Sequence, residues 1–190
     1  ALTTNRTIGL TYPYHVFAPS GDAVGVALLS RWPILEQQAW HHPSYIRAVV
    51  QPPTFDEVVV YVVHPVPPQG TGPGPLPLSF DTTQRTDDQK MIRAAIDSDL
   101  AADRSVVVMG DLNTTEREPA YADFTAGLND AHLDAGIGPG LTWRPDELKS
   151  LPFGLFRIDY ILSSPDLMAN QTAVKCTALS DHCMVAAAYP

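Results

Sequence analysis

Short apolar runs separated by proline, glycine and polar residues dominate the first part of the chain. Residues 24–34 (VGVALLSRWPI), 45–51 and 57–65 are each rich in valine, isoleucine and leucine, and prolines interrupt them. Runs of this length with β-branched residues, bounded by turn formers, are typical of strands. The same pattern predicts further strands at residues 156–164, 172–178 and 182–190.

Helical spacing replaces this pattern in the middle of the chain. Within residues 82–102, apolar side chains recur on one face, at Met91, Ile92, Ala95, Ile96 and Leu100, which predicts an amphipathic helix. Residues 105–111 then predict a strand, and residues 118–132 predict a short helix that ends near Gly127. The Pro/Gly-rich residues 69–79 predict an exposed loop.

Strands outnumber helices, and they occur both as hairpin-like neighbours and as strand–helix–strand units. This order predicts an α/β fold, namely a layered β-sandwich in which two mixed sheets pack face to face and helices flank them. No linker-like segment divides the 190 residues. We therefore expect one domain over residues 1–190, which is long enough to bury a sizeable core.

The composition is that of an acidic globular protein. Apolar residues make up 45% of the chain, and 21 Asp and Glu against 12 Lys and Arg give a net charge of −9. Proteins that bind duplex nucleic acid neutralise many phosphates with a basic face, so strong duplex binding is not expected. A small phosphorylated substrate, held by a metal and a few arginines, is compatible with this charge.

The two cysteines, Cys176 and Cys183, leave two interpretations open. Their spacing allows one disulfide between neighbouring strands, and two reduced thiols packed in the core are equally compatible with the sequence. The cysteines therefore do not decide between an oxidising and a reducing compartment.

Polar side chains stand where four apolar runs end. The four stretches are VVHP, GDLN, RIDYIL and LSDHCMV, and they contain His64, Asp111, Asn113, Asp159, Asp181 and His182. Loops at strand ends are where rigid folds present catalytic groups. A single His or Asp at such a position is most often a turn or cap residue. The four stretches together supply oxygen ligands for a hard cation and imidazoles for proton transfer.

In this order, the motifs resemble those of the endonuclease/exonuclease/phosphatase family, which includes pancreatic deoxyribonuclease. A His is followed by Gly-Asp-x-Asn (GDLN), then by Asp-Tyr (RIDYILSS), then by Ser-Asp-His before the last strand. VGVALLSRWPI resembles the family's strand ending in Ser-Arg-x-Pro, and GPGLTWRP resembles its Thr-Trp segment. The resemblance covers roughly residues 12 to 190. It implies the family's sandwich fold and a Mg²⁺-dependent phosphoesterase, with Mn²⁺ as the alternative cation.

The resemblance also implies catalytic roles. Asp111 would contact the metal region and position or activate the water, and Asp181 would be a metal-side carboxylate. Asn113 would donate its amide N–H to a phosphate oxygen. His182 would stabilise the charge on the phosphate or act as the general base, and Asp159 would fix the tautomer of its ring.

Three further residues are candidates for the surroundings of the substrate. His64 would lie on the other side of the phosphate, as the resemblance implies. Arg47 could point its guanidinium at a phosphate, although a surface ion pair is an equally good interpretation. Trp143, in the loop GPGLTW, is expected to line the substrate groove, with a place in the core as the alternative.

One part of the family pattern is not found. The family opens with a strand, a helix and a strand ending in Gln-Glu, and this glutamate is the principal metal ligand. Here the first residues resemble the segment that follows it, and the only acidic residue before Val24 is Asp22. We expect either that the unit is missing, which would leave one sheet incomplete, or that metal binding is incomplete. Open sheet edges favour association, so a partner or a neighbouring copy would cover them.

Three functions are compatible with the sequence. The leading hypothesis is a Mg²⁺-dependent hydrolase that cleaves a phosphodiester or phosphomonoester by metal-assisted attack of water. The alternatives are a non-catalytic remnant of the fold that binds a phosphorylated ligand or a protein, and a structural module of a membrane-attached protein. The apolar stretch LPFGLF favours a lipid or small phosphodiester. An extracytoplasmic or membrane-proximal setting is expected rather than a cytoplasmic one.

Overall fold

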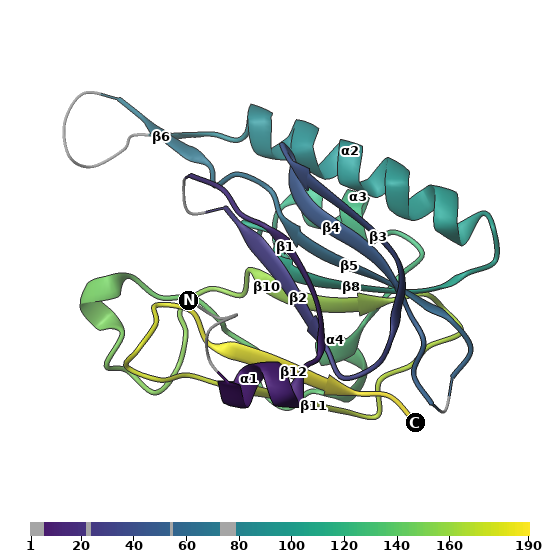
Figure 1. Cartoon of the computed structure of the whole chain (residues 1–190). Helices are drawn as coiled ribbons and strands as arrows, with labels where there is room; N and C mark the ends of the chain where they lie inside the picture. Colours follow the sequence, from purple (N-terminus) through teal and green to yellow (C-terminus); the bar gives the residue numbers. More distant parts are fainter. Residues whose placement is uncertain (1–5, 22–23, 54, 73–78) are drawn as a thin grey trace.

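The computed structural model describes residues 6–21, 24–53, 55–72 and 79–190, and a six-stranded sheet forms its centre (Figure 1). The strands lie in the order β3-β4-β5-β8-β10-β9. β5 and β8 run parallel and all other neighbours are antiparallel, so the sheet is mixed. The bounds of its strands are β3 Ile34–His41, β4 Ser44–Val50, β5 Val58–His64, β8 Ser105–Asp111, β9 Asn129–Asp130 and β10 Asp159–Ser163.

Helices cover one face of this sheet. α2 (Thr83–Leu100) lies between β5 and β8 in the chain, and α3 (Pro119–Thr125) packs beside it (Figure 1). Ile92 and Ile96 of α2 are fully buried against the side chains of β5 and β8 that point toward the helix. Because neighbouring side chains of a strand point to opposite faces, the alternate residues of β5 and β8 form a second core on the other side.

Two antiparallel hairpins pack against that other face. β1 (Tyr14–Ala18) pairs with β2 (Val26–Ser30), and β11 (Gln171–Lys175) pairs with β12 (Met184–Ala188). The first hairpin packs over β3, β4 and β5, whereas β12 packs over β10. A cavity of about 440 Å³, lined largely by apolar side chains of β5, β8, β10 and β12, lies beside them. In the described residues the second layer therefore consists of two separate pieces.

The remaining elements are short. They are α1 Arg6–Thr11, β6 Gln69–Thr71, β7 Ser79–Asp81, α4 Ala131–Ala135 and the 3₁₀-helix η1 Asp146–Leu148. β6 and β7 form a small hairpin at the base of the segment that the sequence predicts as a loop. Residues 73–78 of that segment, and Asp22, lie outside the described residues. Among the helices described, none combines the length and the apolar character that crossing a membrane requires.

The predicted layered α/β architecture is confirmed, and the local differences have physical causes. The sequence misses β3, because this edge strand is mostly exposed and carries polar side chains instead of an apolar run. The strand predicted within residues 24–34, with its end at Ser30-Arg31 before Pro33, is β2 and ends at Ser30, whereas Ile34 begins β3. The short helix predicted to end near Gly127 is α3, which ends at Thr125, and the separate helix α4 capped by Asp130 is not predicted by the sequence pattern.

A buried ion pair ties the end of α2 to the sheet. Arg47 of β4 donates from Nε and Nη2 to the two carboxylate oxygens of Asp99, each over 2.7 Å, and the Tyr61 hydroxyl donates to the same carboxylate over 2.6 Å. Burial raises the pKa of Asp99, but the hydrogen bonds from Arg47 and Tyr61 outweigh it and lower the pKa below its usual value. The guanidinium of Arg47 is therefore engaged beneath α2.

This ion pair predicts an asymmetry between two carboxylates of α2. Asp99→Ala removes the two charge-assisted hydrogen bonds of the half-buried Arg47 and leaves it only the exposed Glu36, so we expect the free energy of unfolding to fall by about 1.5–3 kcal/mol. Asp97→Ala removes the exposed ion pair with Arg93 and should cost at most ~1 kcal/mol. Urea unfolding followed by circular dichroism measures both values, and equal losses would contradict this account.

Candidate active site

The end of strand β8 forms the centre of the site. The backbone N–H of Asn113 donates to Asp111 Oδ1 over 2.7 Å, which turns the chain directly after the strand. Asn113 has φ of 51°, a left-handed conformation that asparagine tolerates better than most residues. Gly110 has φ of 144°, and a Cβ there would lie 2.0 Å from the carbonyl oxygen of Val63. The motif GDLN therefore forms this turn because each residue meets a local steric or hydrogen-bonding need.

Two side chains of α2 hold this turn from behind. Gln89 is buried and donates to the carbonyl oxygen of Leu112 over 2.9 Å and to the hydroxyl of Thr114 over 2.7 Å. Arg85 is also buried, donates to the carbonyl oxygen of Asn113, and forms an ion pair with Glu118. The position of Asp111 is therefore fixed by the helix as well as by the strand.

His182 reaches this strand end from the second layer. It lies directly before Cys183 and β12, and its Nδ1 is 3.0 Å from Asp159 Oδ2 at the start of β10. An ionised carboxylate only accepts hydrogen bonds, so Nδ1 carries the hydrogen and Nε2 is left free. The predicted contact between His182 and Asp159 is therefore present.

Two imidazoles face the same carboxylate oxygen. His182 Nε2 lies 3.9 Å from Asp111 Oδ2, and His64 Nε2, at the end of β5, lies 3.6 Å from the same atom. Asp111, Asp159 and His182 each offer one ligand atom, and these atoms lie within 4.8 Å of one another. Such a set of carboxylates and imidazole could hold a divalent cation.

Burial and neighbouring charges shift the pKa values of Asp111 and His182. Burial, helped by the charge of Asp159, raises the pKa of Asp111 to about 7, against the N–H of Asn113 and the charge of His182. Burial lowers the pKa of His182, but the hydrogen bond to Asp159 and the charges of Asp159, Asp111 and Asp181 outweigh it and raise the pKa above its ordinary value. Two groups with perturbed pKa values thus lie side by side at this strand end, as is common at functional sites.

The rim of the site contains Asp181 and Trp143. The indole Nε1–H of Trp143 donates to Asp181 Oδ2 over 3.3 Å, and the Trp143 ring lies 6.0 Å from the ring of Phe156. Trp143 also forms an isolated antiparallel bridge with His182. Trp143 thus lies beside the predicted site residues.

The structure brings most of the sequence-predicted site residues to one place. They are His64, Asp111, Asn113, Asp159, Asp181, His182 and Trp143. One amide hydrogen of Asn113 is donated to the carbonyl oxygen of Pro65 over 3.0 Å, which leaves the other for a ligand. Arg47 does not join this group, because its guanidinium forms the ion pairs with Asp99 and Glu36.

Sequence reasoning missed the residues that position the site. Gln89 and Arg85 look like ordinary residues of an amphipathic helix, and only their buried polar ends would have indicated a partner. The motif GPGLTWRP indicated the segment Thr142–Arg144 and its Trp143, but not the structural roles of Thr142 and Arg144. The Thr142 hydroxyl accepts the backbone N–H groups of Ile158 and Asp159, over 3.2 and 3.1 Å. These contacts join residues far apart in the chain, so no local pattern reports them.

Solved structures with a similar fold come from several kinds of protein. A mannosyl-6-phosphatase from Bacteroides thetaiotaomicron is 16% identical, with a TM-score of 0.69 over 94% of this chain and 78% of that one. Truncated TDP2 from Caenorhabditis elegans is 15% identical, with a TM-score of 0.67 over 96% of this chain and 77% of that one. Beta toxin from Staphylococcus aureus, with bound magnesium ions, is 19% identical, with a TM-score of 0.61 over 94% and 78%.

Sequence comparison gives the family itself. No curated protein sequence matches the chain significantly. The sequence profile described as "Endonuclease/Exonuclease/phosphatase family" matches residues 2–182, nearly the whole chain. The family predicted from the motifs is confirmed, and the chain belongs to the endonuclease/exonuclease/phosphatase family.

Proposed function

We propose that this chain is a divalent-cation-dependent hydrolase of a small phosphodiester or phosphomonoester. The observation that carries the proposal is the hydrogen bond between His182 and Asp159 beside the buried carboxylate of Asp111. Asp159 orients the ring, so that Nε2 of His182 is directed at the strand end where a phosphate would bind. There it stabilises negative charge on the phosphate or accepts a proton from the attacking water.

The residues at the strand end suit a hard cation such as Mg²⁺ or Mn²⁺. The pKa of Asp111 is raised mainly by burial and further by the charge of Asp159. A bound cation would stabilise the ionised form of this carboxylate, and oxygen ligands are those that Mg²⁺ prefers. Asp111 and Asp181 would hold the ion, while Asp159 is already engaged by His182. A bound divalent cation would neutralise phosphate oxygens and lower the pKa of a water molecule.

The other residues act on the substrate. The second amide hydrogen of Asn113 would donate to a phosphate oxygen, and His64 offers a second imidazole beside Asp111 Oδ2. Trp143 would contact the substrate at the rim of the site, next to Asp181. These positions leave the phosphoryl group between two imidazoles, an amide and the carboxylates.

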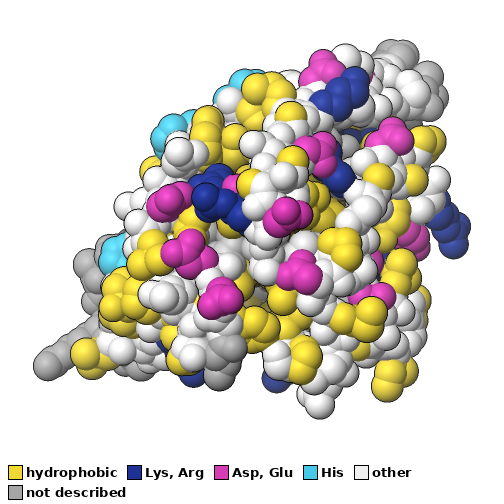
Figure 2. Space-filling model, turned by 90° about the vertical axis from the view of Figure 1, so that its right-hand side faces the viewer, with side chains coloured by type: hydrophobic (Ala, Val, Ile, Leu, Met, Phe, Trp, Pro, Cys, Tyr) yellow, Lys and Arg dark blue, Asp and Glu magenta, His cyan; other side chains and the backbone are white. Residues whose placement is uncertain are grey.

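The charge of the protein supports a small substrate. On the face drawn in Figure 2, acidic side chains are interspersed with basic ones, and no continuous basic surface forms among the residues described there. The net charge of −9 acts in the same direction, because a duplex needs many phosphates neutralised. The disulfide between Cys176 and Cys183 is typical of oxidising compartments, which supports an extracytoplasmic location.

Activity measurements test the proposal. With Mg²⁺ and bis-p-nitrophenyl phosphate, we expect His182→Ala and Asp111→Asn each to lower kcat/KM by about a hundredfold or more, because each removes a charge-stabilising or acid–base group. The controls are His42→Ala and Asp97→Asn, which are exposed and should stay within about twofold. A folded protein that cleaves no phosphodiester, phospholipid or sugar phosphate would favour the non-catalytic phospho-ligand module instead.

The raised pKa of Asp111 predicts how its removal changes stability with pH. Between about pH 4 and about pH 7 the folded state holds a proton on Asp111 that the unfolded state has lost, so this group lowers stability as pH rises. Asn cannot ionise. We therefore expect Asp111→Asn to match the wild type near pH 4 and to exceed its unfolding free energy by roughly 2–4 kcal/mol at pH 8, in chelator.

Thermal unfolding across this pH range measures the difference. Millimolar Mg²⁺ at pH 8 should then stabilise the wild type more than Asp111→Asn, because a ligand that binds only the folded state stabilises it. A variant less stable than the wild type at pH 8 would show that the carboxylate is compensated within the protein, and would remove this argument for a cation.

A further inference from the structure

The 177–182 loop carries His182, and hydrogen bonds within the loop stabilise its conformation only weakly. It connects β11 to β12, and its residues 177–180 are exposed. Two of the hydrogen bonds within it are long, from the Ser180 N–H to the Thr177 carbonyl at 3.5 Å and from the Leu179 N–H to the Thr177 hydroxyl at 3.4 Å, and a third, from the His182 N–H to the Ser180 hydroxyl at 3.1 Å, is exposed. Leu179 is 94% exposed. The position of His182 must therefore be fixed by contacts from outside the loop.

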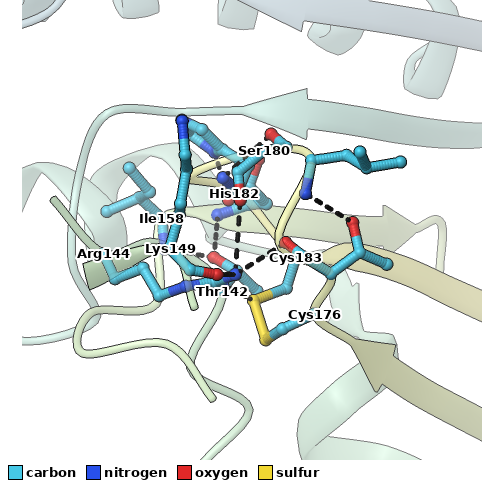
Figure 3. The surroundings of a disulfide bond; sticks show 11 residues. Thr142, Arg144, Lys149, Ile158, Cys176, Ser180, His182 and Cys183 are labelled. Atoms are coloured by element: carbon cyan, nitrogen blue, oxygen red, sulfur yellow. Dashed lines mark hydrogen bonds and ion pairs between the residues drawn. A yellow bond between two sulfur atoms is a disulfide. The ribbon is translucent and has the colours of Figure 1, made fainter. Parts of the chain in front are cut away.

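Arg144 supplies these contacts from beneath the loop (Figure 3). Its side chain is fully buried, and Nη2 donates to the carbonyl oxygens of Lys149, Thr177 and Ser180, over 2.7, 2.9 and 3.3 Å. Its backbone N–H donates to the carbonyl oxygen of Asp181 over 3.1 Å. One residue thus binds three carbonyl groups of the loop.

The chemistry of Arg144 is unusual for a buried cation. No ion pair within the described residues involves it, and its partners are carbonyl oxygens and one sulfur. A buried charge is costly unless its hydrogen-bonding groups find partners. The two terminal nitrogens of Arg144 serve several acceptors at once, whereas its buried Nε has no hydrogen-bond partner among the described residues. Arg144 therefore binds carbonyl groups from separate parts of this loop and holds them together.

The disulfide closes the same loop at its base. Cys176 and Cys183 flank the loop, and Cys183 directly follows His182. Arg144 Nη1 lies 2.9 Å from Cys183 Sγ, so the guanidinium and the disulfide touch (Figure 3). The Cys183 N–H donates to the carbonyl oxygen of Thr142 over 2.6 Å.

The segment Thr142–Arg144 also places the partner of His182. The hydroxyl of Thr142 accepts the N–H of Asp159, while its carbonyl oxygen accepts the N–H of Cys183. Both members of the pair between His182 and Asp159 are thus located relative to one short segment. A shift of the loop against this segment would separate the two.

We propose that Arg144 and the Cys176–Cys183 disulfide together position His182 against Asp159, so that opening the disulfide lowers turnover at the proposed active site. They act through the 177–182 loop and touch no substrate. A dithiol opens the bond by forming two cysteine thiols and becoming a cyclic disulfide itself, and oxidation reverses the change. The inference rests on the proposed function for its kinetic part only.

Reduction of the wild-type protein tests the proposal directly. The chain has two cysteines, so dithiothreitol acts on this bond alone, and thiol titration counts its opening. We expect kcat to fall about 10- to 100-fold with KM nearly unchanged, because a misplaced group affects the chemical step, and reoxidation to restore it. The double variant Cys176→Ala/Cys183→Ala should have the low kcat and not respond to the dithiol.

Arg144→Met, with the disulfide intact, should lower kcat to a similar extent. Its matched control is Arg93→Met, because Arg93 also donates to a backbone carbonyl, that of Phe124, but between α2 and α3. That variant should lower stability and leave kcat unchanged. An Arg144→Met protein with reduced stability and wild-type kcat would overturn the positioning role.

The imidazole signal of His182 and circular dichroism distinguish a failure of the positioning role from a failure of the proposed function. In side-chain ¹H–¹⁵N spectra, the imidazole signal of His182 should change on reduction, whereas that of His42 should not. If the oxidised protein hydrolyses no phosphoester, the proposed function fails, but this signal still decides the positioning. A reduced, folded protein with unchanged kcat or an unchanged His182 signal overturns the proposal. Unfolding on reduction, seen by circular dichroism, also overturns it, since the disulfide would then hold the whole fold.

Discussion

The contact between His182 and Asp159 depends on how the two layers of the sandwich stack. Asp159 begins β10 of the six-stranded sheet, and His182 precedes β12 of the hairpin that packs over it. Their side chains meet across 3.0 Å, so a small shift of the hairpin would separate them. The segment Thr142–Arg144 joins the two layers here, because it bridges to His182 and accepts backbone N–H groups of Asp159 and Cys183. The site is thus a property of the layer interface, and no single element contains it.

The electrostatics of the site follow from the same arrangement. Closing the layers removes Asp111 from water while bringing Asp159 and Asp181 close to it, which raises its pKa to about 7. His182 and His64 lie near the same carboxylate, but the pKa of Asp111 stays raised because the effect of burial is larger. A fold that concentrates negative charge in this way is suited to a cation and to a substrate whose phosphate the cation can approach.

Arginine serves mainly as an internal support in this protein. Arg85 and Arg144 bind carbonyl oxygens of the loops that carry Asn113 and His182, and Arg157 pairs with the buried Asp130. Arg47 ties α2 to the sheet. Each guanidinium satisfies several acceptors in a fixed plane, which explains why these polar groups are buried. These four arginine side chains are therefore engaged inside the fold. In the proposed function, a divalent cation held by carboxylates would neutralise more of the phosphate charge.

The sequence by itself determined the layered α/β class, most of the long elements and the six polar residues at the strand ends. These follow from local patterns, since β-branched runs mark strands buried on both faces and GDLN forms its turn through Gly110 and Asn113. Only the tertiary structure decided the edge strand β3, the disulfide, and the place of Arg47 beneath α2 rather than in the site. An exposed edge strand has no apolar run to recognise. The seven-residue spacing of the cysteines is compatible with a disulfide and with two free thiols, and Asp99, the partner of Arg47, lies far away in sequence. The partners of these residues are decided only when the layers pack, because each buried polar group then requires a hydrogen-bond partner.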